Sequence, residues 1–131
     1  MIVLDTHVLL WWVSGVSRLS ARAARAISQG VKEGALIVSS ITVFEISTAV
    51  RRGRLELASP LEQWLADLRG LPELAFEPVT AEIAQLAGQL DASFPGDPAD
   101  RIIVATALVS SAKLVTADQR LRATPNLAVV W

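Results

Sequence analysis

The stretch IVLDTHVLLWW, residues 2–12, places a short apolar run, an aspartate and a second apolar segment in direct succession. A short apolar run that stops at a turn-forming polar residue is typical of a buried strand. Asp5 then stands where a helix would begin, and aspartate is a favoured N-cap residue. The stretch therefore predicts a strand over residues 2–5 that leads directly into a helix starting near His7.

The same alternation of strand and helix continues through the chain. Further strands are predicted over residues 35–40, 74–80, 113–118 and 127–131. Helices are predicted between them over residues 20–33, 41–52, 60–69, 81–94 and 98–112. The residues SPLE at the start of the 60–69 helix are typical of a capping box, with Pro60 as the first helical residue. Strands that alternate with helices imply parallel pairing, so we expect an α/β fold with helices flanking a parallel sheet.

Composition limits the classes of protein to which this chain can belong. Its 131 residues fit one domain, residues 1–131, and 52% hydrophobic against 19% charged residues exclude a disordered chain. The absence of cysteine excludes disulfides and thiolate metal sites. A net charge of −1 argues against a broad basic surface for coating nucleic acid. The start lacks the basic region of a signal peptide, and no apolar run has membrane-spanning length, so we expect a cytoplasmic protein.

Four acidic residues fall near the ends of the predicted strands. Asp5 and Asp118 close two of them, while Glu45 and Asp100 lie in the early turns of helices. Ligands of open parallel sheets bind at the carboxyl ends of the strands, so we expect all four carboxylates to meet at one edge. Asp100 also shares a helical stripe with Ile103 and other apolar residues, which directs its carboxylate toward the buried side.

Each acid also has a purely structural interpretation. Asp5 fits a helix cap, Glu45 fits a capping box with Thr42, and Asp118 fits the start of a turn. In the stretch DPADRIIVATAL, residues 97–108, Asp97 fits the N-cap, Pro98 the first helical residue, and Asp100 an acid that reaches back toward the cap.

Four separate helix caps would not need to lie at the same edge of the sheet, whereas the ligands of one metal ion must converge. A shared site therefore explains why all four acids fall near the ends of the predicted strands. Carboxylates that approach one another repel, and cations or bound protons make their proximity tolerable. Hard divalent ions such as Mg²⁺ prefer oxygen ligands. Zinc is disfavoured, since the chain has one histidine and no cysteine.

Four motifs carry a resemblance to a known family. LDTHVLL, SSITVFEI, DPADRIIVATAL and LVTAD, in this order within residues 2–118, resemble those of PIN-domain ribonucleases, specifically the VapC-type toxins. The resemblance implies a parallel sheet flanked by helices and an acidic pocket that binds Mg²⁺ or Mn²⁺. Carried over by position, the catalytic acids are Asp5, Glu45, Asp100 and Asp118. His7 stands where asparagine is frequent in the wider family.

Within that resemblance the residues take different roles. Asp5 and Asp100 are the implied direct metal ligands, with Glu45 and Asp118 as auxiliary acids. Thr6 and Thr116 match hydroxyl positions that support the pocket. Asp97 is interpreted as the helix cap, with an auxiliary metal role as the alternative.

The implied activity is metal-dependent cleavage of RNA phosphodiester bonds. Candidate RNA-binding residues are Arg51, Arg52, Arg54 and Arg101, and Arg18, Arg22 and Arg25 line another helix face; a solvated surface explains such clusters equally well. Adjacent Trp11 and Trp12 fit base stacking or simple packing. The resemblance also implies a homodimer and a VapB-type antitoxin that inserts a segment near the acidic pocket.

Three alternatives belong to other classes. A response-regulator receiver expects adjacent early acids and a lysine after a late threonine, whereas Lys113 precedes Thr116. A haloacid-dehalogenase phosphatase expects a second aspartate where this chain has His7. A non-catalytic binding module on the PIN fold would normally lack one of the pocket acids, and all four are present.

Overall fold

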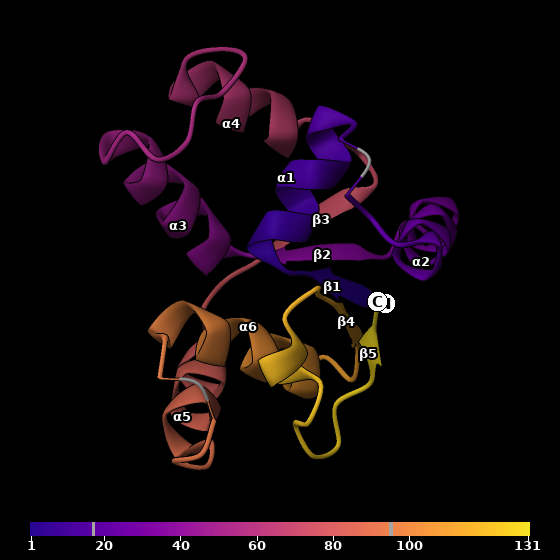
Figure 1. The fold of residues 1–131 in the computed structure, drawn as a ribbon, viewed down its shortest axis with the longest axis vertical. Helices are drawn as coiled ribbons and strands as arrows, with labels where there is room; N and C mark the ends of the chain where they lie inside the picture. The colour runs from indigo at the N-terminus through magenta and orange to yellow at the C-terminus, as the bar shows by residue number, and fades with distance from the viewer. Residues whose placement is uncertain (17, 95) are drawn as a thin grey trace.

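A computed structural model describes residues 1–16, 18–94 and 96–131, built around a five-stranded parallel sheet (Figure 1). The strands are β1 (Ile2–Leu4), β2 (Leu36–Ser39), β3 (Leu74–Glu77), β4 (Lys113–Val115) and β5 (Val129–Val130). Their order in the sheet is β3-β2-β1-β4-β5, and all four pairings are parallel. The predicted α/β fold is confirmed.

β1 lies at the centre of the sheet and is buried on both faces. Ile2 pairs with Leu36 of β2 on one side and with Lys113 of β4 on the other. Ile2 and Leu4 pack into one hydrophobic cluster, while Val3 packs into a second cluster across the sheet. This placement explains the uninterrupted apolar run of the sequence, because a strand covered on both faces needs apolar residues at every position.

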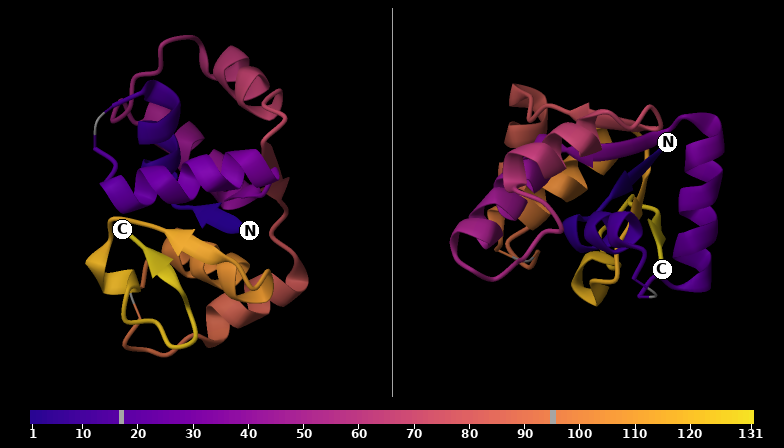
Figure 2. Two further views of the ribbon diagram at one scale, coloured as in Figure 1. Left: turned by 90° about the vertical axis from the view of Figure 1, so that its right-hand side faces the viewer. Right: turned by 90° about the horizontal axis from the view of Figure 1, so that it is seen from above.

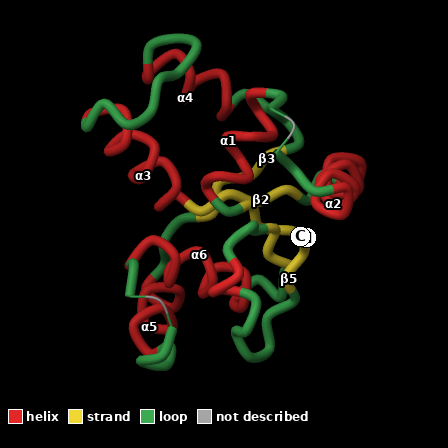
Figure 3. Tube along the Cα trace, in the orientation of Figure 1, coloured by secondary structure: helices red, strands yellow, loops and turns green. Residues whose placement is uncertain are grey.

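Helices cover both faces of the sheet (Figures 1 and 2). The face of Ile2 and Leu4 packs against α1 (Thr6–Ser14), α2 (Ala21–Glu33) and α4 (Leu61–Arg69). The face of Val3 packs against α6 (Pro98–Val109), and α5 (Ala81–Gln89) packs on α6. α3 (Ser40–Arg51) leaves the carboxyl end of β2 and contacts α1, α4 and α6. Figure 3 shows how short the strands are beside these helices.

Several predicted boundaries are wrong. The capping box before α4 does not form, because Pro60 is itself the N-cap and no side chain caps the helix. α5 ends at Gln89 rather than at residue 94, since Leu90 takes an extended backbone (ψ 143°). α6 ends at Val109 rather than at residue 112, and Ser111 adopts a positive φ of 50°. The predicted strand over residues 113–118 ends at Val115, which leaves Thr116 and Asp118 beyond the sheet.

In the described part of the chain, no helix has both the length and the apolar character needed to cross a membrane.

Candidate active site

Asp5 joins the carboxyl end of the central strand β1 to that of its neighbour β4. As the N-cap of α1 it accepts a hydrogen bond from the backbone N–H of Thr6, at 2.8 Å from Oδ1. Its other oxygen, Oδ2, accepts a hydrogen bond of 2.6 Å from the hydroxyl of Thr116, just after β4. Both residues are buried. Asp5 therefore has the predicted capping position and also bridges β1 and β4, where the strand order changes direction and open sheets bind ligands.

Glu45 reaches the same place from α3. The hydroxyl of Thr6 donates to Oε1 of Glu45 at 2.5 Å and lies 2.9 Å from the hydroxyl of Thr42. The alternative capping box of Thr42 with Glu45 does not form, because Ser39 is the N-cap of α3 and accepts from the N–H of Ile41. Glu45 is thus held against the start of α1.

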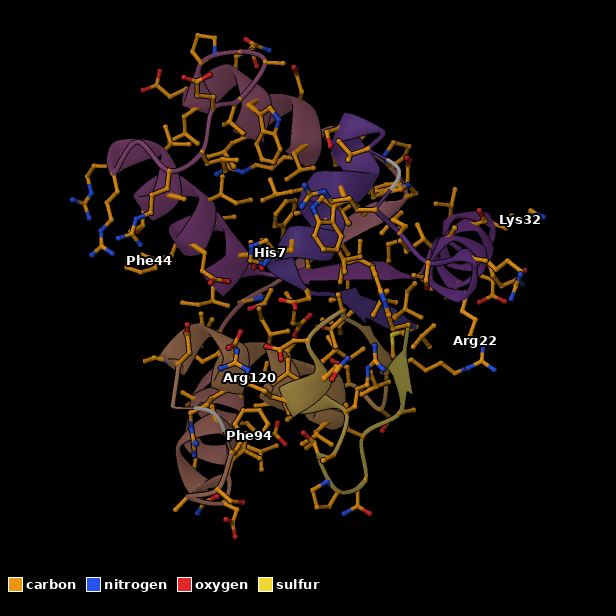
Figure 4. The ribbon with its side chains drawn as sticks, viewed as in Figure 1. His7, Arg22, Lys32, Phe44, Phe94 and Arg120 are labelled. Atoms are coloured by element: carbon orange, nitrogen blue, oxygen red, sulfur yellow. The ribbon has the colours of Figure 1, made fainter. Side chains whose placement is uncertain are left out.

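Asp100 and Asp118 approach each other through one arginine. Asp118 is the N-cap of the short 3₁₀ helix η1 (Gln119–Leu121). Nη2 of Arg120, in η1, lies 2.6 Å from Oδ2 of Asp118 and 3.5 Å from Oδ2 of Asp100 in α6. Arg120 is labelled in Figure 4, below His7. Arg120 is not among the predicted site residues, although a cation two residues after an acid that starts a turn indicates such a pair.

The electrostatics of Asp100 connect all the candidate acids. Burial is the largest of the effects that together raise the pKa of Asp100 to about 7, and the negative charges of Asp97, Asp5, Glu45 and Asp118 follow in that order. Burial likewise raises the pKa of Glu45 above its usual value, with Asp5 and Asp97 adding to the effect. The hydrogen bond from Arg120 lowers the pKa of Asp118. The four predicted acids and Asp97 therefore lie close enough to act on one another.

Asp97 occupies the predicted N-cap of α6. Its Oδ1 accepts a hydrogen bond of 2.9 Å from the N–H of Ala99, and Pro98 is the first helical residue. The reaching-back bond suggested for Asp100 is not formed, since the hydrogen-bond partner of Asp100 is Arg120. Asp97 adds negative charge beside both Asp100 and Glu45.

The oxygen atoms of this acidic cluster are of the chemical type that a hard divalent cation prefers. Carboxylates converge here with threonine hydroxyls, and these oxygens are the ligands that Mg²⁺ and Mn²⁺ prefer. Within the described residues, however, no three His, Asp or Glu side chains are arranged to hold one ion. Protein groups hold these acids: the backbone N–H of Thr6 and the hydroxyl of Thr116 donate to Asp5, and the hydroxyl of Thr6 donates to Glu45. Arg120 pairs with Asp100 and Asp118.

The predicted RNA-binding arginines are not drawn into this acidic cluster. Arg51, Arg52 and Arg54 are exposed at and beyond the end of α3. Arg54 borders a hollow of about 740 Å³ whose other lining residues include Thr6 and Glu45.

Arg101, the fourth predicted RNA-binding arginine, makes contacts within the domain. Its Nε and Nη2 donate to the carbonyl oxygens of Ala87 and Leu90, at 2.9 and 2.5 Å, and its guanidinium lies 5.6 Å from the ring centre of Phe94. Arg101 thus holds the end of α5.

Comparison with protein families gives a clear result. The model of the PIN domain matches residues 2–127, nearly the whole chain. The chain belongs to the PIN-domain family. This PIN domain is similar to Ribonuclease VapC22 of Mycobacterium tuberculosis (strain ATCC 25618 / H37Rv), with 39% identity over 99% of this chain and 98% of that protein.

Solved structures share the fold of this PIN domain. The structure of FitAcB from Neisseria gonorrhoeae is similar with a TM-score of 0.70 and 25% identity, over 98% of this chain and 96% of that one. VapBC2 from Rickettsia felis, bound to a DNA fragment from its promoter, gives a TM-score of 0.69 at 21% identity, over 98% and 97% of the two chains. A toxin-antitoxin complex from Klebsiella pneumoniae gives 0.65 at 20% identity, over 98% and 96%.

Proposed function

We propose that this PIN domain is an endoribonuclease and the toxin of a VapBC-type toxin–antitoxin pair. The observation that carries the proposal is the convergence of Asp5, Glu45, Asp100 and Asp118 at the carboxyl edge of the sheet, where each of the other three raises the pKa of Asp100. The full-length similarity to a VapC ribonuclease supports the same activity.

In this proposal Asp5 and Asp100 hold Mg²⁺ or Mn²⁺, and Glu45 and Asp118 are auxiliary acids. When bound, the divalent ion supplies positive charge that stabilises the developing charge on the phosphoryl oxygens. Thr6 and Thr116 keep the Asp5 carboxylate in one orientation by donating to its two oxygens. Glu45, bound to the hydroxyl of Thr6, is held facing the same space.

The test of this function compares cleavage of a single-stranded RNA by the wild type, Asp5→Asn and Asp100→Asn, with Mg²⁺, with Mn²⁺ and with EDTA. We expect cleavage by the wild type with either metal, none with EDTA, and at least a hundredfold loss in each variant, because each substitution removes a charged ligand. An asparagine variant that keeps full activity removes that residue from the mechanism. EDTA-resistant cleavage would contradict the metal requirement.

The proposed partner is a VapB-type antitoxin. The hollow of about 740 Å³ beside the acidic cluster supports this, because Thr6 and Glu45 line one part of it while Leu10, Trp11 and Trp64 provide an apolar wall. A partner segment lying there would cover Glu45, one of the four candidate acids. Titration of the toxin with its antitoxin should abolish cleavage at a one-to-one ratio, and sedimentation of the free toxin tests the proposed homodimer.

A non-catalytic binding module on the same fold is the competing function. It predicts RNA binding without cleavage under every metal condition. Gel analysis of the RNA after incubation with the wild type therefore separates the two functions.

A further inference from the structure

A basic hollow of about 440 Å³ lies beside the edge strand β5 and is distinct from the acidic cluster. Four cationic residues line it from three parts of the chain, namely Arg22 and Arg25 of α2, Lys113 at the start of β4, and Arg122 just after η1. All four are exposed. The other lining residues are Ala26, Val129, Val130 and Trp131, so no aspartate or glutamate borders the hollow.

In the part of the chain that the structure describes, these cations have no acidic partner. Within residues 1–16, 18–94 and 96–131, both ion pairs involve Arg120, and none involves a residue of the basic hollow. The chain has 13 acidic against 12 basic residues, yet none of the acidic ones neutralises this place. Four like charges around one concave surface repel each other, and a bound anion with several negative charges relieves that repulsion.

A row of aromatic rings connects the basic hollow with the acidic cluster. The ring of His7, next to Thr6, lies 6.0 Å from that of Trp11, and Trp11 lies 5.9 Å from Trp131 in the basic hollow. His7 is exposed, and the two tryptophans are partly so. The guanidinium of Arg18 lies over Trp11, 6.0 Å from the ring centre.

The two adjacent tryptophans thus have different surroundings. Trp12 packs against the hydrophobic core, whereas Trp11 belongs to the aromatic row, in which its neighbour Trp131 also packs partly against that core. Figure 2 shows that the start of α2, the C-terminus and η1 lie along the same side of the molecule, the side to which the strands point.

We propose that single-stranded RNA crosses this surface from the acidic cluster, with its bases on His7, Trp11 and Trp131 and its phosphates in the basic hollow. The inference rests on the proposed function for the substrate class. Cationic surfaces interleaved with aromatic rings are what single strands require, because phosphates pair with the cations and bases stack on the rings. An acidic protein segment would use the cations but would not need the aromatic rings beside them.

The experiment measures the affinity of a fluorescent single-stranded RNA by anisotropy, with all variants in an Asp100→Asn background and with Mg²⁺ present. The double variant Arg22→Gln/Arg25→Gln removes two cations of the basic hollow. Its matched control is Lys32→Gln/Arg69→Gln, which removes two exposed cations outside it; Arg22 and Lys32 are both labelled on α2 in Figure 4.

We expect the hollow variant to raise Kd about tenfold and to reduce the slope of log K against log salt by about 1.4, or about 0.7 for each lost phosphate contact. The control should retain the affinity and the slope. Trp11→Ala should weaken binding several-fold with an unchanged salt slope, because stacking releases no counterions.

Equal affinity of the hollow variant and its parent would overturn the inference, as would an equal loss in the control. This result is distinguishable from failure of the proposed function. If the wild type cleaves RNA but the hollow variant binds it normally, the function stands and the inference fails. If binding depends on the basic hollow but nothing is cleaved, the inference stands and the nuclease assignment fails.

Discussion

At the scale of single residues, the raised pKa of Asp100 makes stability depend on pH. The folded protein holds a proton on Asp100 up to about pH 7, whereas the unfolded chain releases it near its ordinary value of 3.8. The folded state therefore binds more protons between these values, so the stability of the metal-free protein falls as pH rises through the window. Glu45, whose pKa is also raised, contributes in the same direction.

We predict that Asp100→Asn flattens this dependence. In EDTA at pH 8 the variant should be more stable than the wild type by about 1–2 kcal/mol, a value reduced from the full shift because solvent screens a half-buried carboxylate. Urea melts from pH 4 to pH 8.5 measure it. The exposed Glu62→Gln serves as the control and should keep the wild-type profile. A wild type whose stability rises from pH 5 to pH 8 would contradict the prediction.

Asp97 provides a separate prediction, because its side chain caps α6. Asp97→Ser should keep the cap, since serine caps nearly as well, and should retain most of the RNA cleavage. Asp97→Ala should lose about 0.5–2 kcal/mol of stability, the usual range for a lost cap. Thermal melts in EDTA and cleavage assays with Mg²⁺ measure both. If Asp97→Ser melts normally but is inactive, Asp97 is a metal ligand.

The roles that depend on neighbours in the sequence were predictable for the site residues, whereas the roles that depend on contacts between distant segments were not. Asp97 and Asp118 cap the elements that follow them, as their neighbours in sequence indicate. Arg120 reaches Asp100 across 20 residues, and only the packing of η1 beside α6 brings them together. The sequence around Arg101 does not indicate its hydrogen bonds to the carbonyl oxygens of Ala87 and Leu90, because these residues belong to the end of α5.

At the scale of elements, the contact of α2 with the sheet depends on one glycine. A Cβ added at Gly30 would lie 2.6 Å from Leu36 Cδ2 and 3.1 Å from Ile2 Cδ1, and Leu36 is completely buried. Gly88 lies in α5 with nothing within 4 Å of such a Cβ. Replacing glycine by alanine should therefore have opposite effects on stability in α2 and in α5.

We predict that Gly30→Ala lowers the free energy of unfolding by about 1–2 kcal/mol, because overpacking exceeds the gain in helix propensity. Gly88→Ala should raise it by about 0.5–1 kcal/mol, since only the gain applies. Chemical denaturation of both variants beside the wild type measures the difference. A Gly30→Ala protein at least as stable as the wild type would show that α2 can shift away from the sheet at little cost.

The elements themselves were predicted better than their ends. Each predicted strand and helix exists, because apolar periodicity reflects burial, and burial here follows the layers of the fold. The end of α5 was missed because Leu90 continues the apolar stripe although its backbone is extended. The SPLE pattern failed because Pro60 itself is the N-cap, so Ser59 lies one residue too early to cap α4.

At the scale of the whole molecule, metal binding should appear as stabilisation. We predict that millimolar Mn²⁺ raises the melting temperature at pH 8, because a ligand bound only by the folded state stabilises it by mass action. The rise should be smaller at pH 6, where Asp100 keeps its proton and competes with the ion. Differential scanning fluorimetry with Mn²⁺ and with EDTA measures both conditions. Asp100→Asn is the control and should lose most of the rise, and equal wild-type melting curves with and without Mn²⁺ would contradict metal binding.

The central position of β1 has a consequence for synthesis on the ribosome. β1 is translated before the other strands of the sheet, yet it pairs with β4, and the hydrogen bond between Asp5 and Thr116 spans 111 residues. A nascent chain therefore lacks one side of its acidic cluster until β4 has been made. Such distant pairing slows folding, since a long loop must close before any contact compensates for it. The acidic cluster is consequently completed only after both β4 and η1 have been synthesised.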